Sequence, residues 1–148
     1  MTIIGWDRSI TPARAAQHGA TVVSKDELFE ASDLLTIHLP LSDSSRGLVG
    51  SRELALMKPT AYLINTSRGP IVDEAALLDA LHSGRLAGAA LDVYDSEPLP
   101  TGHPLRSAPN TLLLPHLGYV TTDQYARFYA DVVEDIVAWD DGAPVRVL

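Results

Sequence analysis

The stretch "AYLINTSRGPIVDEAALLDAL", residues 61–81, decides the fold because it joins three features in a fixed order. An apolar run over 61–65 predicts a buried strand, and a polar segment with a Gly-Pro pair then turns the chain. Asp73 can cap a helix whose leucines lie on one face and which ends before Gly84. A strand, a polar turn and a helix in this order are typical of α/β proteins.

The same alternation continues in both directions along the chain. Further strands are predicted over 2–6, 21–23, 34–39, 86–93 and 111–114. Further helices are predicted over 12–18, 24–32, 51–57 and 122–140. Near-continuous apolar strands that alternate with helices predict a parallel sheet covered on both faces. No internal repeat is visible.

The pattern over 122–140 differs from the other helices in its length. Its apolar residues form one stripe, while Asp131, Glu134 and Asp135 lie mostly off that stripe. At about 1.5 Å per residue the helix spans roughly 28 Å, which is longer than a crossover needs. We therefore expect a long C-terminal helix that reaches beyond its own sheet.

Composition excludes several classes of function. The formal net charge is −8 and the basic residues are scattered, so we expect no nucleic-acid partner. The chain has no cysteine, which removes disulfides, zinc-thiolate sites and thiol nucleophiles, and no metal site is expected. No apolar run approaches the roughly 20 residues that span a bilayer, and no leader pattern is visible, so a cytoplasmic protein without a membrane partner is expected.

Polar side chains follow the predicted strands at the points where the strands end. In parallel sheets ligands gather at this edge, so these residues are the candidates for function. The candidates are Asp7, His38 with Pro40, the segment 65–69, Asp92 with Glu97, and His116 with Gly118.

Three of these candidates have a structural alternative. Arg68 could clamp a carboxylate with its guanidinium fork, or it could cap carbonyls or pair with Asp73 at the surface. His116 could exchange protons as a general acid and base, or it could be a structural histidine. Glu97 could fix the tautomer of an imidazole, or it could be a solvated loop acid. The three together form a carboxylate clamp, a proton donor and its carboxylate partner.

Three motifs in order resemble the D-2-hydroxyacid dehydrogenases, an NAD-dependent family. They are "INTSRGPIVDEAALLDAL" at 64–81, "GAALDVYDSEPLP" at 88–100 and "LLPHLGYVT" at 113–121. The resemblance covers essentially the whole chain. It implies a Rossmann-type fold and hydride transfer between the nicotinamide and the 2-carbon of a 2-hydroxy or 2-oxo acid.

The resemblance also implies roles for the catalytic candidates. Arg68 matches the arginine that holds the substrate carboxylate and polarises its carbonyl, His116 matches the acid/base histidine, and Glu97 matches the acid paired with it. Asp7 matches the ribose-binding acid, which favours NAD because a 2′-phosphate would be repelled. Arg8 beside it keeps NADP as the second alternative.

Further residues match the family's cofactor groove. Asp92 matches the residue that binds the carboxamide, and Gly118 matches a glycine that lets the backbone approach the nicotinamide ring. The other matching positions are Ser45, His38, Leu39, Pro40 and Thr66. Tyr119 occupies a position that is often small in relatives, which leaves the shape of the substrate pocket open, and no residue identifies the particular 2-hydroxy acid.

Two parts of the family pattern do not occur in this sequence, the glycine-rich GxGxxG turn with its strand and the substrate domain. We therefore expect an incomplete Rossmann-type sheet, with residues 1–120 as a partial dinucleotide-binding domain. Residues 121–148 would be a helix and tail that pack on the substrate domain in the family. The segment 1–23 could pair directly with 34–39, form a separate sheet, or complete a partner chain.

These absences lead to two expectations about function. The first is the C-terminal part of a dehydrogenase that binds NAD weakly or not at all by itself. It would be inactive unless the N-terminal part is supplied, and it would form a homo-oligomer or a complex with that part. The alternative is a non-catalytic interaction module, or a vestigial one, derived from the family.

Overall fold

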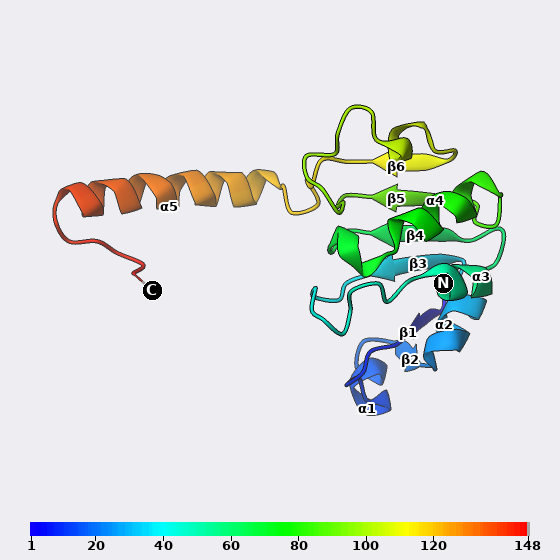
Figure 1. Ribbon diagram of the computed structural model, residues 1–148. Helices are drawn as coiled ribbons and strands as arrows, with labels where there is room; N and C mark the ends of the chain where they lie inside the picture. The colour runs from blue at the N-terminus through cyan, green and yellow to red at the C-terminus, as the bar shows by residue number, and fades with distance from the viewer. Residues whose placement is uncertain (148) are drawn as a thin grey trace. The chain divides into compact units, whose positions relative to one another are not determined.

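The computed structural model describes residues 1–147 as an α/β protein in which short strands alternate with helices (Figure 1). The chain divides into two compact units, Met1–His116 and Leu117–Leu148. The first unit contains all the strands of the described residues, and the second contains the long C-terminal helix. Each unit is described by itself below.

The strands agree in number and order with the sequence prediction, and all except the second, which is shifted by one residue, are shorter. They are β1 (Ile3–Gly5), β2 (Ala20–Val22), β3 (Leu34–Ile37), β4 (Tyr62–Asn65), β5 (Gly88–Leu91) and β6 (Thr111–Leu113). The helices are α1 (Pro12–Ala16), α2 (Lys25–Ala31), α3 (Ser51–Leu56), α4 (Glu74–His82) and α5 (Thr122–Asp140). Two 3-10 turns that the sequence did not predict are η1 (Gly69–Ile71) and η2 (Pro104–Ser107).

The strands form two separate parallel sheets. One sheet has the order β1-β2, and the other has the order β3-β4-β5-β6. Of the three arrangements considered for the N-terminal segment, the structure therefore shows the separate sheet. The larger sheet brings the carboxyl ends of its strands to one edge, because all three of its ladders are parallel.

The hydrophobic core lies on one face of the larger sheet. Leu35, Leu63 and Leu91 point into it, and Leu54 of α3 and Leu77 of α4 are buried in the same cluster. The ladder pairs Leu35 with Leu63, so alternate residues of each strand share this face. This face supplies the packing that holds the strands and helices together.

The opposite face of the larger sheet is exposed. The register places Leu34 beside Tyr62, and Thr36, Ile64, Ala90 and Leu112 in one row across the strands. Leu34 and Leu112 are each 59% exposed and Tyr62 is 46% exposed. The sequence predicts helices over both faces of the sheet; within residues 1–116, the structure shows one face buried and the other exposed.

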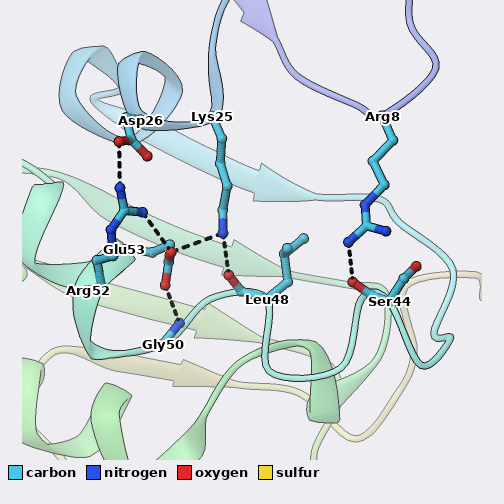
Figure 2. Close-up of polar contacts among 8 residues, drawn as sticks. All are labelled: Arg8, Lys25, Asp26, Ser44, Leu48, Gly50, Arg52 and Glu53. Atoms are coloured by element: carbon cyan, nitrogen blue, oxygen red, sulfur yellow. Dashed lines mark hydrogen bonds and ion pairs between the residues drawn. The ribbon is translucent and has the colours of Figure 1, made fainter.

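A polar network attaches α2 to the beginning of α3 (Figure 2). The carboxylate of Glu53 accepts hydrogen bonds from Lys25 at 2.9 Å, from Arg52 at 3.1 Å and from the Gly50 N–H at 3.1 Å. Arg52 also reaches Asp26 on α2 at 2.5 Å. Burial raises the pKa of Glu53, but these hydrogen bonds outweigh burial and lower the pKa to about 2.

A second contact between distant segments lies after β1. The Nη2 atom of Arg8 donates a hydrogen bond to the Ser44 carbonyl at 2.9 Å, so the loop after β1 is tied to the loop after β3 (Figure 2). These polar contacts link the two sheets through loops and helices, since no ladder joins β1 to β3 among the residues the structure describes.

The C-terminal unit contains the segment 117–121, α5 and the tail that follows it. The helix covers the predicted range 122–140, and the Thr121 hydroxyl caps it by accepting from the Gln124 N–H at 3.2 Å. The guanidinium of Arg146 returns to three acids of α5: Asp131, Glu134 and Asp135. Among the described residues, no helix is sufficiently long and apolar to cross a membrane.

Candidate active site

Asn65 fixes the turn that carries Arg68 at the end of β4. Its side chain is 1% exposed, accepts a hydrogen bond from the Ser67 N–H at 3.0 Å and donates one to the Arg68 carbonyl at 2.9 Å. Because both ends of the amide are bonded to the turn, the turn holds one shape. The strand ends here, since its last ladder pair joins Ile37 to Asn65.

The Arg68 side chain is exposed and begins next to the end of the sheet. Its Nη1 atom donates to the Ser67 carbonyl at 2.6 Å, which is the carbonyl-capping contact considered from the sequence. The expected alternative partner, Asp73, instead caps α4 by accepting from the Ala76 N–H at 3.0 Å. Capping therefore accounts for one contact of a guanidinium that has five N–H donors.

Gly69 packs directly against the loop after β5. A Cβ atom at Gly69 would lie 2.1 Å from the carbonyl carbon of Tyr94 and 2.6 Å from the backbone nitrogen of Asp95. Only a residue without a side chain allows this approach. The contact sets the Arg68 turn beside the segment that leads to Glu97, and the charge of Arg68 lowers the pKa of Glu97.

Glu97 and His116 form a short hydrogen bond between two strand ends. The Nδ1 atom of His116 lies 2.6 Å from Oε2 of Glu97, and Oε1 of the same carboxylate accepts from the Tyr94 N–H at 2.9 Å. Burial raises the pKa of Glu97, but these hydrogen bonds and the charges of His116 and Arg68 outweigh it and lower the pKa. An ionised carboxylate only accepts, so Nδ1 of the neutral ring carries the proton.

His116 follows β6 in an uncommon backbone conformation. Its φ angle is +59°, in the left-handed region that residues with a side chain adopt rarely. His116 lines a cavity of about 510 Å³ together with Glu97, Tyr94 and Arg106; the other lining residues are Pro98, Leu99, Leu113, Leu114 and Pro115. The proposed acid/base pair thus faces a cavity of the size that small molecules occupy.

Asp7 follows β1, as the sequence predicts, and is bonded within its own loop. Its Oδ1 atom accepts from both the Ser9 N–H at 2.6 Å and the Ser9 hydroxyl at 2.7 Å. The hydroxyl and N–H of Ser9 are the main cause of the lowered pKa of Asp7. The ionised side chain can accept hydrogen bonds from the hydroxyls of a ribose.

The loop after β3 contains four of the predicted cofactor residues, and their side chains differ in exposure. His38 is exposed and contacts the Thr36 hydroxyl at 3.0 Å, while the Leu39 carbonyl accepts from the Ser67 hydroxyl. Ser45 is 6% exposed and donates to the Pro40 carbonyl at 2.7 Å. The bonds of Ser45 therefore hold the loop in shape.

The remaining predicted cofactor residues lie at other strand ends. Thr66 is exposed directly after β4, whereas Asp92 is 3% exposed directly after β5, where its N–H continues the ladder to the Asn65 carbonyl at 3.0 Å. Gly118 and Tyr119 belong to the second unit, whereas the other predicted site residues belong to the first.

Sequence reasoning did not single out Tyr94, although Tyr94 contacts several parts of this site. Its N–H binds Glu97, its backbone meets Gly69, and its hydroxyl lies 2.8 Å from the Leu114 carbonyl. Leu114 is 20 residues further along the chain, so no local spacing rule relates the two. A tyrosine three residues before Glu97 was the only available signal.

Comparison with known proteins gives one consistent family. The family model described as "D-isomer specific 2-hydroxyacid dehydrogenase, NAD binding domain" matches residues 1–118. The chain is 44% identical over 142 residues to a glyoxylate reductase of Aeropyrum pernix, a match that covers 96% of this chain and 42% of that protein. It is 41% identical over 146 residues to a D-3-phosphoglycerate dehydrogenase of Synechocystis, with 99% and 26% covered.

Solved structures with the same fold include proteins bound to either nicotinamide cofactor. A phosphoglycerate oxidoreductase from Vibrio cholerae superposes with a TM-score of 0.85 at 36% identity, over 97% of this chain and 46% of that one. An NAD-complexed 2-hydroxyacid dehydrogenase from Lactobacillus delbrueckii gives 0.77 at 28% identity, with 98% and 48% covered. A Xanthobacter autotrophicus relative with NADPH and MES gives 0.73 at 37% identity, with 97% and 58% covered. The chain thus spans less than half of the curated relatives described here.

Proposed function

Because the chain belongs to the D-isomer specific 2-hydroxyacid dehydrogenase family, we propose that it supplies the NAD-binding and proton-transfer part of such an enzyme. The observation that carries the proposal is the 2.6 Å contact between His116 Nδ1 and Glu97 Oε2 at the carboxyl edge of the sheet. Bound NAD would supply or accept the hydride in this chemistry.

His116 exchanges the hydroxyl proton of the substrate in this proposal. Glu97 holds the proton on Nδ1, so Nε2 is the nitrogen that gives a proton to a 2-oxo group or takes one from a 2-hydroxy group. The proton and the hydride then reach the two atoms of the same carbonyl bond. The ionised Glu97 also stabilises the ring when it is charged.

Arg68 binds the substrate carboxylate in this proposal. A planar guanidinium pairs with a carboxylate through two parallel hydrogen bonds, which a lysine does not reproduce. The substrate is therefore a small 2-hydroxy or 2-oxo acid. Asn65 and Gly69 support Arg68 by holding the turn on either side of it.

The cofactor is NAD in preference to NADP. The lowered pKa of Asp7 keeps its carboxylate charged near neutral pH, where it accepts from ribose hydroxyls and repels a 2′-phosphate. The hydrogen bond from Arg8 to the Ser44 carbonyl directs that cation to the neighbouring loop. The exposed His38 and Thr66 would border the same groove, with Pro40, Asp92 and Gly118 as further proposed contacts.

Activity requires a partner segment in this proposal. The chain covers 42% and 26% of two matched relatives, so the proposal is tested below by adding an N-terminal part in trans. Self-association and a cytoplasmic location remain predictions from the sequence. A non-catalytic interaction module is the competing proposal, supported by the exposed apolar face of the larger sheet.

The test combines the full chain with a separately produced N-terminal part of the Aeropyrum pernix relative. Oxidation of NADH is followed at 340 nm with glyoxylate, and reduction of NAD with D-3-phosphoglycerate. We expect turnover that the Arg68→Lys and His116→Asn variants lower by about 100-fold or more. A stable complex without turnover, together with no binding of NAD in calorimetry, would support the non-catalytic module instead.

A further inference from the structure

We infer that Tyr94 is a positioning residue that sets the orientation of His116 against Glu97; this inference rests on the proposed acid/base role of the pair. Tyr94 is 7% exposed, and its hydroxyl contacts carbonyls at the ends of β5 and β6, the two strands that these residues follow. Its backbone binds the carboxylate, and its side chain binds the segment that leads to the imidazole.

The backbone contact fixes Glu97. The Tyr94 N–H donates to Oε1 at 2.9 Å, while His116 occupies Oε2 of the same carboxylate at 2.6 Å. Both oxygens of the carboxylate are therefore engaged, and the plane of the group is defined. The packing of Gly69 against the Tyr94 carbonyl holds this part of the loop against the turn of Arg68.

The hydroxyl contact fixes the approach to His116. Oη of Tyr94 lies 2.8 Å from the Leu114 carbonyl and 3.1 Å from the Leu91 carbonyl, which already accepts from the Leu114 N–H at 2.9 Å. The hydroxyl has one proton, and the shorter contact favours Leu114 as its acceptor. Burial, and then the charge of Asp92, raise the pKa of Tyr94, so the hydroxyl keeps its proton near neutral pH.

The conformation of the segment from Leu114 to His116 depends on the Tyr94 hydroxyl contact, because the segment itself offers few backbone hydrogen bonds. Pro115 has no N–H and adds no donor, and His116 adopts a φ of +59°, which is uncommon for a residue with a side chain. A bonded carbonyl directly before this pair limits the directions that the ring can take. Tyr94 thus couples three elements of the site: the Arg68 turn, the Glu97 loop and the end of β6.

The test measures the tautomer of His116 in the full chain. In ¹⁵N-histidine-labelled protein, ring nitrogen shifts report the ratio of the Nδ1–H to the Nε2–H form at a pH where the ring is neutral. Tyr94→Phe removes only the hydroxyl, and we expect it to lower this ratio about 5-fold. Tyr62→Phe on the exposed face is the matched control and is expected to leave the ratio unchanged. The His116→Asn variant assigns the signals.

A rescue variant separates positioning from general stability. The unnatural residue 4-aminophenylalanine at position 94 keeps a donor in place of the hydroxyl, so we expect it to restore the wild-type ratio. An unchanged ratio in Tyr94→Phe would overturn the inference. Unfolding of Tyr94→Phe, with a folded amine variant of altered ratio, would also overturn it by assigning the hydroxyl to stability alone.

The activity assay keeps the two proposals distinguishable. In the reconstituted enzyme, we expect Tyr94→Phe to lower kcat by about 5- to 10-fold while KM for NADH changes less than about 2-fold. An inactive wild-type complex would contradict the proposed function and leave the tautomer measurement to decide the positioning role. An active wild type with an unchanged tautomer ratio in the variant would contradict positioning alone.

Discussion

The Nζ atom of Lys25 on α2 lies 2.9 Å from Oε1 of Glu53 on α3, and this contact joins helices whose paired residues are 28 positions apart. Glu53 is 8% exposed, and it also receives Arg52 and the Gly50 N–H. A single buried carboxylate therefore connects the helix that follows β2 to the helix that precedes β4.

Acid is expected to weaken the fold through Glu53. Its folded pKa of about 2 lies below its ordinary value of 4.5, so its stabilisation is complete above about pH 4.5 and is lost as the pH falls toward 2. Glu53→Gln should lower the free energy of unfolding at pH 7 by at most about 3 kcal/mol, and less where solvent screens the pair. The difference from wild type should shrink on acidification.

Urea unfolding at pH 7 and pH 3 measures this effect. Glu30→Gln, an exposed position on α2, is the matched control and should stay within about 0.5 kcal/mol of wild type. Equal stability of Glu53→Gln and wild type at pH 7 would contradict the role of Glu53.

Gly69→Ala is expected to disrupt the turn that carries Arg68. The added Cβ would lie 2.1 Å from the Tyr94 carbonyl carbon, so one of the two loops has to move. We expect a loss of about 2 kcal/mol or more in thermal or urea unfolding. Gly102→Ala is the matched control because no atom lies within 4 Å of its added Cβ. Similar midpoints for the two variants would refute the close packing.

His116→Asn is expected to keep the fold. The His116 side chain is 39% exposed, and asparagine tolerates the left-handed backbone conformation better than alanine does. We expect the free energy of unfolding to stay within about 1 kcal/mol of wild type in chemical denaturation. His116→Ala should be less stable than His116→Asn because of its backbone. An unfolded His116→Asn chain would favour the structural histidine considered from the sequence.

Removal of Arg146 should release the tail from α5. The guanidinium lies 2.5 Å from Glu134, 2.6 Å from Asp135 and 3.2 Å from Asp131, and the contacts with Glu134 and then Asp135 raise its pKa. In Arg146→Ala, amide hydrogen exchange over residues 143–147 should become faster. High salt should produce the same effect in wild type by screening the charges. Arg127→Ala, which removes one longer contact at 3.7 Å, should change the tail little.

Local signals predicted α5 more accurately than the sheets. The apolar stripe lies within the helix sequence itself, and the helix occupies the predicted range. The separation of β1-β2 from the larger sheet depends on pairings between distant strands, which a run such as Ile3–Gly5 does not specify. The same reason explains why Glu53 was missed: its partner Lys25 is distant in the sequence.

The sequence predicted the residues of the candidate site but not the hydrogen bonds that hold those residues in position. The motifs name His116, Glu97 and Arg68, and the structure brings His116 and Glu97 into contact, while the roles of all three remain proposals. The hydrogen bonds of Asn65 and Tyr94 could be identified only from the structure, because any residue supplies a backbone carbonyl acceptor such as that of Leu114. Ser45 was predicted as a cofactor residue, and the structure shows that its buried hydroxyl donates a hydrogen bond to its own loop. A motif match does not reveal such a bond.

The apolar side chains on the exposed face of β3 to β6 should lower the solubility of the chain. Leu34, Tyr62 and Leu112 favour attraction between molecules, whereas the net charge of −8 keeps molecules apart. These two forces respond differently to salt, because added salt screens the charge repulsion and leaves the apolar attraction in place. The solubility of the chain should therefore decrease as ionic strength rises.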